Sequence, residues 1–225
     1  HVHLGLGAEA GTTAHHAVCS FKMTGTGLSK KLMQTVSVSG GLGDQVAILI
    51  YAATLWVALG LLYPKPPATD TGAALRRFGL AVTALVYFMI LTGGFVAGTH
   101  AGFAFNDWPF MHGQLVPRGL YALDPWWINL FENLATVQFN HRLVAYLLCL
   151  VIPAYWFMAR RLRLEARTRS LFHLLLAMLA VQVALGIATL VYVVPVSLAA
   201  AHQAGALVLL TFALLLNHRL RSGPA

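Results

Sequence analysis

The sequence predicts an all-α, polytopic membrane protein, a helix bundle with about five transmembrane helices. Hydrophobic residues fill 58% of the 225 positions and charged residues fill only 10%, whereas a typical soluble domain carries about 25% charged residues. Five apolar stretches are long enough to cross roughly 30 Å of hydrocarbon as helices. These stretches are residues 46–62, 78–98, 137–158, 171–194 and 198–217.

The stretches divide the chain into four parts. Residues 1–45 are rich in Gly, Ser, Thr and His and show neither helical nor strand periodicity, so we expect a poorly ordered or aberrant N-terminal segment. Residues 46–63 form a single transmembrane helix, residues 78–217 form a four-helix bundle, and residues 218–225 form a tail. Because the chain starts with His and shows no signal peptide, we expect a fragment or a processed form.

The charges between the stretches predict the orientation of the helices. The links after the first and third stretches and the tail after the fifth carry ten basic residues, whereas the loop 99–136 carries only Arg118 against three acidic residues. The positive-inside rule therefore places the basic links in the cytoplasm or its organellar equivalent and the loop outside. Ten of the fifteen Lys and Arg residues lie in these links and the tail, so the net charge of +8 is a topology signal and forms no basic face. We therefore expect membrane lipid and not nucleic acid as a partner.

Two histidines, His141 and His202, each lie about four residues inside the start of an apolar stretch. The predicted topology makes both helices run inward from the outer surface, so the two imidazoles lie at one depth. An unpaired polar ring in hydrocarbon costs several kcal/mol. Two neutral imidazoles at matched height are what a six-coordinate heme iron needs on its two faces, and His141 and His202 are therefore predicted iron ligands.

The neighbours of these histidines suggest further cofactor contacts. Arg142 is a candidate partner for a heme propionate, because a guanidinium pairs with a carboxylate in a forked geometry; the alternative is a polar cap at the lipid headgroups. Gln203 beside His202 has only small apolar neighbours, and polar residues within spans are by default functional. The aromatic and glycine-rich loop after residue 98 is either a lid over a cofactor edge or an interfacial aromatic belt.

A faint internal repeat supports the pairing of the histidines. Small residues in the second and fourth stretches precede a histidine at the head of the third and fifth, which leaves space either for a flat ligand or for close helix packing. The residues that form this repeat are Gly93, Gly94, Gly98 and His141 in the first copy and Gly186, Ala188 and His202 in the second.

Three runs of the sequence resemble heme A synthases of the alphaproteobacterial and mitochondrial type. The runs are residues 93–109 (GGFVAGTHAGFAFNDWP), 131–142 (FENLATVQFNHR) and 186–205 (GIATLVYVVP followed by AAAHQAG), and the resemblance covers roughly residues 46–220. It implies an oxidoreductase with eight transmembrane helices in two pseudo-symmetric halves, which oxidises the C8 methyl of heme O to the formyl of heme A. It also implies that the C-terminal half holds heme b between His141 and His202.

The chain departs from this family pattern in its first half. It holds the last four helices and a remnant of the preceding one, and Thr99-His100 stands where most relatives have Leu-Asp. The resemblance therefore implies the cofactor-heme half without the substrate site, and the catalytic residues are unknown. It further implies heme O as substrate, an unidentified electron donor, and the bacterial cytoplasmic or mitochondrial inner membrane. Two alternatives remain: a b-type cytochrome that only transfers electrons, and a remnant without heme. The oligomeric state is open, a homo-oligomer included.

Overall fold

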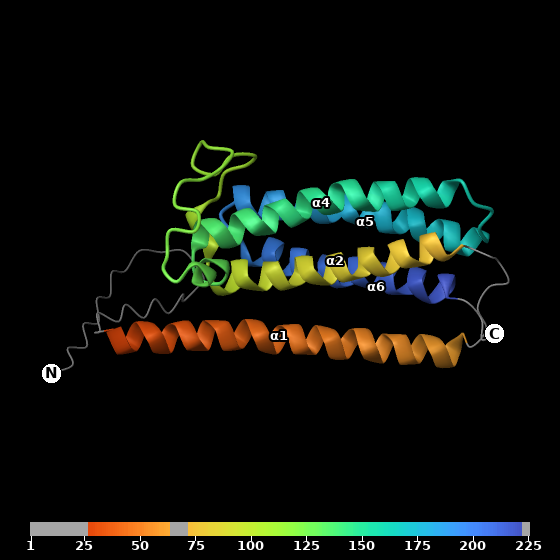
Figure 1. Cartoon of the computed structure of the whole chain (residues 1–225), viewed down its shortest axis with the longest axis horizontal. Coiled ribbons are helices and arrows are strands. Elements are labelled where there is room, and N and C mark those ends of the chain that lie inside the picture. The colour runs from red at the N-terminus through yellow and green to blue at the C-terminus, as the bar shows by residue number, and fades with distance from the viewer. Residues whose placement is uncertain (1–26, 64–71, 222–225) are drawn as a thin grey trace, which may run out of the picture.

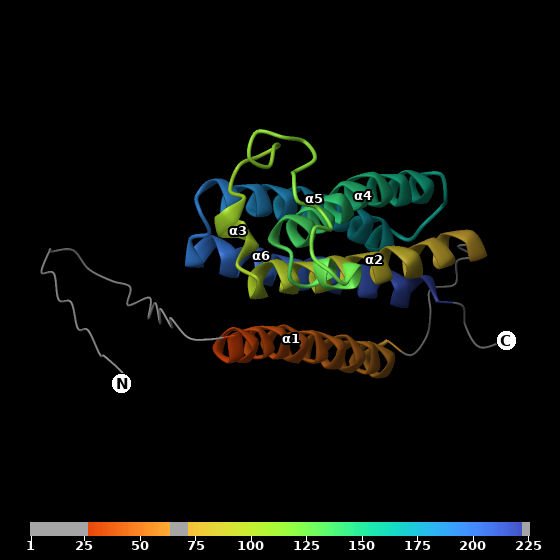
Figure 2. The ribbon, with the colours of Figure 1, turned by 60° about the vertical axis from the view of Figure 1, so that its left-hand side comes forward.

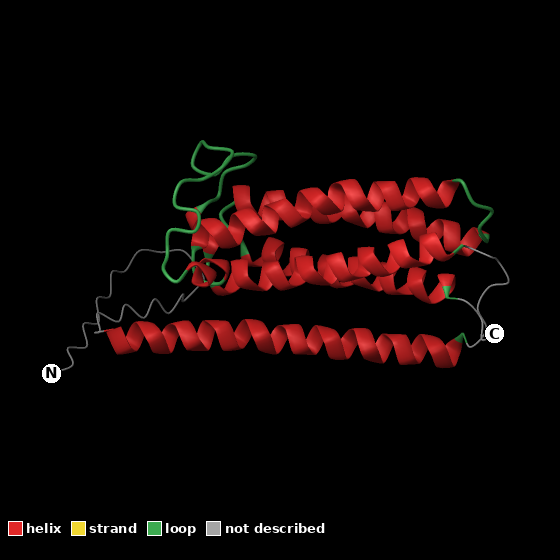
Figure 3. Ribbon diagram, in the orientation of Figure 1, coloured by secondary structure: helices red, strands yellow, loops and turns green. Residues whose placement is uncertain are grey.

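The computed structural model describes residues 27–63 and 72–221, with side chains from Gln45 onward. Within these residues the chain is helical and contains no strand (Figures 1 and 3), which confirms the all-α prediction. Five helices are long and apolar enough to cross a membrane, and the chain is a multi-pass integral membrane protein. The elements are α1 (Gly27–Leu62), α2 (Ala73–Gly98), α3 (Ala101–Ala104), η1 (Trp126–Leu130), α4 (Leu134–Arg160), α5 (Ala166–Val191) and α6 (Val196–Leu220).

Helix α1 begins earlier than the sequence analysis placed it. We expected residues 1–45 to lack helical structure, but the helix starts at Gly27, while residues 1–26 lie outside the described part of the chain. The apolar segment of α1 that is suited to the membrane is Gln45–Leu62. Extending an existing helix adds one hydrogen bond for each residue fixed, so a stable apolar helix can continue into a sequence with little periodicity of its own.

Helices α2, α4, α5 and α6 form a four-helix bundle in which each helix packs against two neighbours, in the cyclic order α2, α4, α5, α6. The buried core runs along the whole bundle, and its largest members include Leu75, Leu148, Ile152, Tyr155, Phe172, Leu175, Leu210 and Leu216. Helix α1 lies beside this bundle against α2 and α6 (Figures 1 and 2). The Tyr51 hydroxyl of α1 lies 2.6 Å from Oγ1 of Thr211 in α6.

One polar contact joins α6 to α2 inside the bundle. Asn217 Nδ2 donates to the carbonyl oxygen of Gly79 at 3.2 Å and to Oγ1 of Thr83 at 2.5 Å. The helices can approach because Gly79 has no side chain: a Cβ there would collide with the Tyr155 hydroxyl and the Asn217 amide. Such interhelical hydrogen bonds contribute on the order of 0.6 kcal/mol each in membranes, so this contact chiefly fixes the register of the two helices.

The two ends of the bundle differ in character. The loop end carries α3, η1 and the long connection between α2 and α4, whereas the basic end carries the link 161–165 and the end of α6 (Figure 1). Helices α4 and α6 both start at the loop end, as the topology predicted. Asn133 caps α4 by accepting from the Thr136 amide at 3.1 Å, and α6 begins directly after Pro195.

Candidate functional site

The imidazole of His141 is held by α2 at the loop end of the bundle. Its Nδ1 lies 2.9 Å from Oγ1 of Thr92. The ring also packs on the neighbouring Gly93, where an added Cβ would stand 3.3 Å from Cε1 of His141. A hydrogen bond and a glycine therefore fix the position of this ring together.

The contacts of the Thr92 hydroxyl favour one protonation state of His141. The hydroxyl oxygen lies 2.8 Å from the carbonyl oxygen of Met89, which can only accept, and 2.9 Å from Nδ1 of His141, which can donate or accept. When the single hydroxyl hydrogen goes to Met89, the oxygen accepts from Nδ1 and this nitrogen is the donor. In a neutral imidazole the other nitrogen then carries a lone pair. Nε2 of His141 is thus the atom available to bind a metal.

The imidazole of His202 occupies the equivalent position between α6 and α5. A Cβ on Gly186 would stand 3.0 Å from Cε1 and 3.5 Å from Nε2 of this ring. One turn earlier in α5, Gln182 Nε2 donates to the His202 carbonyl oxygen at 2.7 Å. Nδ1 of His202 is buried without a hydrogen-bond partner.

The two histidine sites repeat the same arrangement. Each imidazole from α4 or α6 packs on a glycine of the preceding long helix, Gly93 in α2 or Gly186 in α5, which is the pairing expected from the sequence repeat.

These residues suit a bis-histidine heme better than a metal ion with several protein ligands. A structural zinc ion takes four protein ligands and a catalytic one takes three, and the described residues contain no group of three or more His, Cys, Asp or Glu side chains that could hold a metal. A heme iron needs only two axial ligands from the protein. The glycine contacts of both rings and the free Nε2 of His141 fit such a cofactor.

Arg142 holds the outer loop, a role that the sequence analysis missed. Its guanidinium is buried at the head of α4, with the residue 7% exposed. Nη1 donates to the carbonyl oxygen of Phe110 at 2.8 Å and Nη2 to that of Asp107 at 2.9 Å. Gln138, one turn earlier, donates to the Phe105 carbonyl at 2.7 Å. The spacing of Gln138 and Arg142, four residues apart on one face of α4, was the available signal.

The other predicted contacts are less informative. The pairing of Arg142 with a propionate stays a prediction, because its two terminal nitrogens are occupied by loop carbonyls and only Nε lacks a partner. Gln203 is exposed on α6, and its cofactor contact also stays a prediction. His173 lies far from the site, toward the basic end, where its Nδ1 accepts from the Trp156 indole at 3.0 Å.

The loop is built as an ordered cover over the end where the imidazoles lie. The Asp107 carboxylate accepts from the backbone amides of His112 at 3.0 Å and Gly113 at 3.1 Å. Partial desolvation raises the pKa of Asp107, but these amides and the Arg142 charge outweigh it and hold the pKa below its ordinary value. Thr136 Oγ1 accepts from the Tyr121 amide at 3.1 Å, so the loop is tied to α4 at several points.

The match to a family model decides the family. The model described as cytochrome oxidase assembly protein (COX15-CtaA) matches residues 22–214. The chain belongs to this family. It is similar to proteins named heme A synthase: 50% identical over 178 residues to that of Nitrosospira multiformis, 44% over 204 residues to that of Nitrosomonas eutropha, and 42% over 180 residues to heme A synthase COX15 of Homo sapiens. The resemblance found in the sequence is confirmed.

The alignments cover much of this chain but a smaller share of its relatives. They span 78%, 84% and 79% of the chain, and 50%, 57% and 44% of the three relatives in the same order. The chain thus spans about half the length of the curated relatives it matches. No solved structure matches it.

Proposed function

We propose that this chain is the cofactor-heme half of a heme A synthase, with His141 and His202 as the axial ligands of a heme b. The observation that carries the proposal is the repeated packing of these two imidazoles, from parallel helices at one end of the bundle, on Gly93 and Gly186. Membership of a family with heme A synthases supports the reaction, which is oxidation of the C8 methyl of heme O to the formyl group of heme A.

The chain's own residues have three tasks in this proposal. Thr92 would keep the proton of His141 on Nδ1 and so leave the lone pair of Nε2 for the iron. Gly93 and Gly186 leave room for the rings against α2 and α5, because a Cβ at either position would crowd Cε1 of the imidazole. Arg142 and Gln138 hold the loop over the site and limit the access of water. Heme b bound here supplies one-electron transfer between an unidentified donor and the half of the enzyme that binds heme O.

Heme A production in cells that lack their own heme A synthase tests this proposal. The chain is co-expressed with the N-terminal half of a relative, as wild type and as His141→Ala, His202→Ala and the control His173→Ala, and hemes are extracted and separated by chromatography. We expect heme A from the wild type and the control and none from the other two variants. Bound heme b with no heme A from any combination would instead indicate a b-type cytochrome module without synthase activity.

A further inference from the structure

A cavity opens at the basic end of the molecule, away from the two imidazoles. It has a volume of about 400 Å³ and lies between α1, α5 and α6. Its walls combine leucines with a few polar groups. The lining leucines are Leu59, Leu171, Leu174 and Leu215, and the polar lining residues are Tyr63, Arg167, Ser170, His218 and Arg219.

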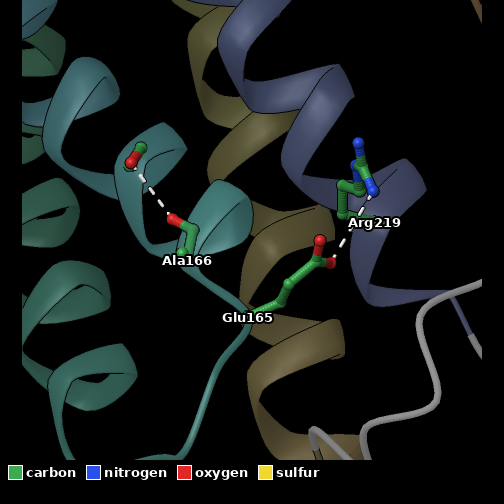
Figure 4. Close-up of polar contacts among 4 residues, drawn as sticks. Glu165, Ala166 and Arg219 are labelled. Atoms are coloured by element: carbon green, nitrogen blue, oxygen red, sulfur yellow. Dashed lines mark hydrogen bonds and ion pairs between the residues drawn. The ribbon is translucent and has the colours of Figure 1, made fainter.

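The cationic groups of this cavity are only lightly engaged by the protein. Arg219 Nη1 lies 3.8 Å from Oε2 of Glu165, and both side chains are partly exposed (Figure 4). The Arg219 guanidinium also lies over the Tyr63 ring, 5.4 Å from its centroid. Exposed ion pairs of this kind contribute little. Ser170 donates its hydroxyl hydrogen to the Ala166 carbonyl at 3.0 Å, which leaves its oxygen as an acceptor.

His218 gives an independent sign that a ligand belongs here. The residue is 4% exposed, and its ring packs edge-on against Trp56 with 5.6 Å between the centroids. Nε2 of His218 is buried without a hydrogen-bond partner. Buried polar atoms in native proteins are nearly always satisfied by protein, water or ligand, and His218 is one of the residues that line the cavity.

The position of the cavity favours an anionic phospholipid as its occupant. The positive-inside rule places the basic end at the cytoplasmic or matrix leaflet, whose surface is negative because of its anionic lipids. Basic pockets between transmembrane helices on this side bind such headgroups. We propose that the cavity binds the headgroup of an anionic phospholipid against Arg167, Arg219 and His218, with the first part of an acyl chain along the four leucines.

This proposal does not rest on the heme assignment, because the cavity lies at the opposite end of the bundle from His141 and His202. Its failure would leave the proposed function untouched, and the reverse also holds. The functional consequence is an anchor that holds α1 beside the bundle: the cavity is lined by α1 on one side and by α5 and α6 on the other.

Native mass spectrometry of the purified full chain in detergent tests the site. The probes are short-chain phosphatidylglycerol, short-chain phosphatidylcholine and inorganic phosphate. We expect phosphatidylglycerol to bind more tightly than phosphatidylcholine, and Arg167→Gln and Arg219→Gln each to weaken it roughly fivefold. Arg163→Gln is the matched control, because Arg163 carries the same charge in the neighbouring link without lining the cavity.

Three outcomes would overturn the proposal. Equal binding of the two lipids would remove the role of charge, and equal weakening by Arg163→Gln would mean that any cation at this face suffices. Displacement of phosphatidylglycerol by inorganic phosphate at equal concentration would indicate a free-anion site without an acyl chain. Gel filtration and circular dichroism of each variant establish that it is folded. All three arginines are at the surface or rim, so we expect their substitution to leave the fold unchanged and the affinities to be comparable.

Discussion

Replacing Thr92 by Val isolates the hydrogen bond that orients His141. The two side chains have nearly the same shape, so the packing of α2 on α4 is kept while the acceptor 2.9 Å from Nδ1 is lost. The Nδ1–H group then faces the valine methyl group and has lost its protein acceptor. Leaving a buried donor unsatisfied costs roughly 1–3 kcal/mol.

The loss is expected to appear as weaker heme binding. Outer hydrogen-bond partners of metal ligands are typically worth roughly 10- to 100-fold in metal affinity, which agrees with the free energy above. The assay is a heme titration of the detergent-solubilised apo-chain, followed by absorbance, together with the midpoint potential of the bound heme. We expect Thr92→Val to bind roughly 10- to 100-fold more weakly and with a shifted potential, and Thr92→Ser to restore both values.

Thr83 supplies the control, because it is a threonine of the same helix that accepts a hydrogen bond from Asn217 away from the imidazoles. Thr83→Val is expected to lower thermal stability slightly and to leave heme affinity and potential unchanged. Wild-type affinity and potential in Thr92→Val, or an equal loss in Thr83→Val, would refute the assignment of Thr92 as the residue that positions His141.

Three further predictions concern the second imidazole and the loop. Gly186→Ala places a Cβ about 3.0 Å from Cε1 of His202, so the ring must shift, and we expect reduced heme content in pyridine hemochrome assays at unchanged expression. Arg142→Gln removes charged hydrogen bonds to the loop worth roughly 1.5–3 kcal/mol each, and limited proteolysis should then cut within residues 105–116 several-fold faster; an unchanged rate would contradict the clamp. The lowered pKa of Asp107 means that its stabilisation of the loop is complete above the ordinary carboxyl pKa of about 3.9 and is lost as the pH falls through the lower folded value. The ratio of the proteolysis rates of the wild type and Asp107→Asn should therefore be independent of pH from neutral down to the ordinary carboxyl pKa. A wild-type loop that loses its protection near pH 6 would contradict this assignment.

The sequence was sufficient for the class of fold and for the end of the bundle at which the two histidines lie. Hydropathy locates helices because every backbone polar group in hydrocarbon must be satisfied within the segment, and the arginine-rich links fix the direction of each helix. His141 and His202 consequently had to lie at the same end, and the structure places them there.

The remaining features depend on contacts between distant segments, which no local pattern encodes. From the sequence alone, Arg142 is either a propionate partner or an interfacial cation. Only the path of the loop shows that the carbonyls of Asp107 and Phe110 lie against its guanidinium. Thr92 was not singled out because a threonine in a span usually bonds its own helix, as it also does here. The early start of α1 was missed because weak periodicity does not limit how far an established helix extends.

The absorption spectrum of the purified chain, oxidised and reduced, tests the central claim most directly. We expect a low-spin b-type spectrum from the wild type and from His173→Ala, and its loss in both His141→Ala and His202→Ala at equal protein yield. A wild-type spectrum that survives either of these two substitutions would contradict the assignment of His141 and His202 as the axial ligands.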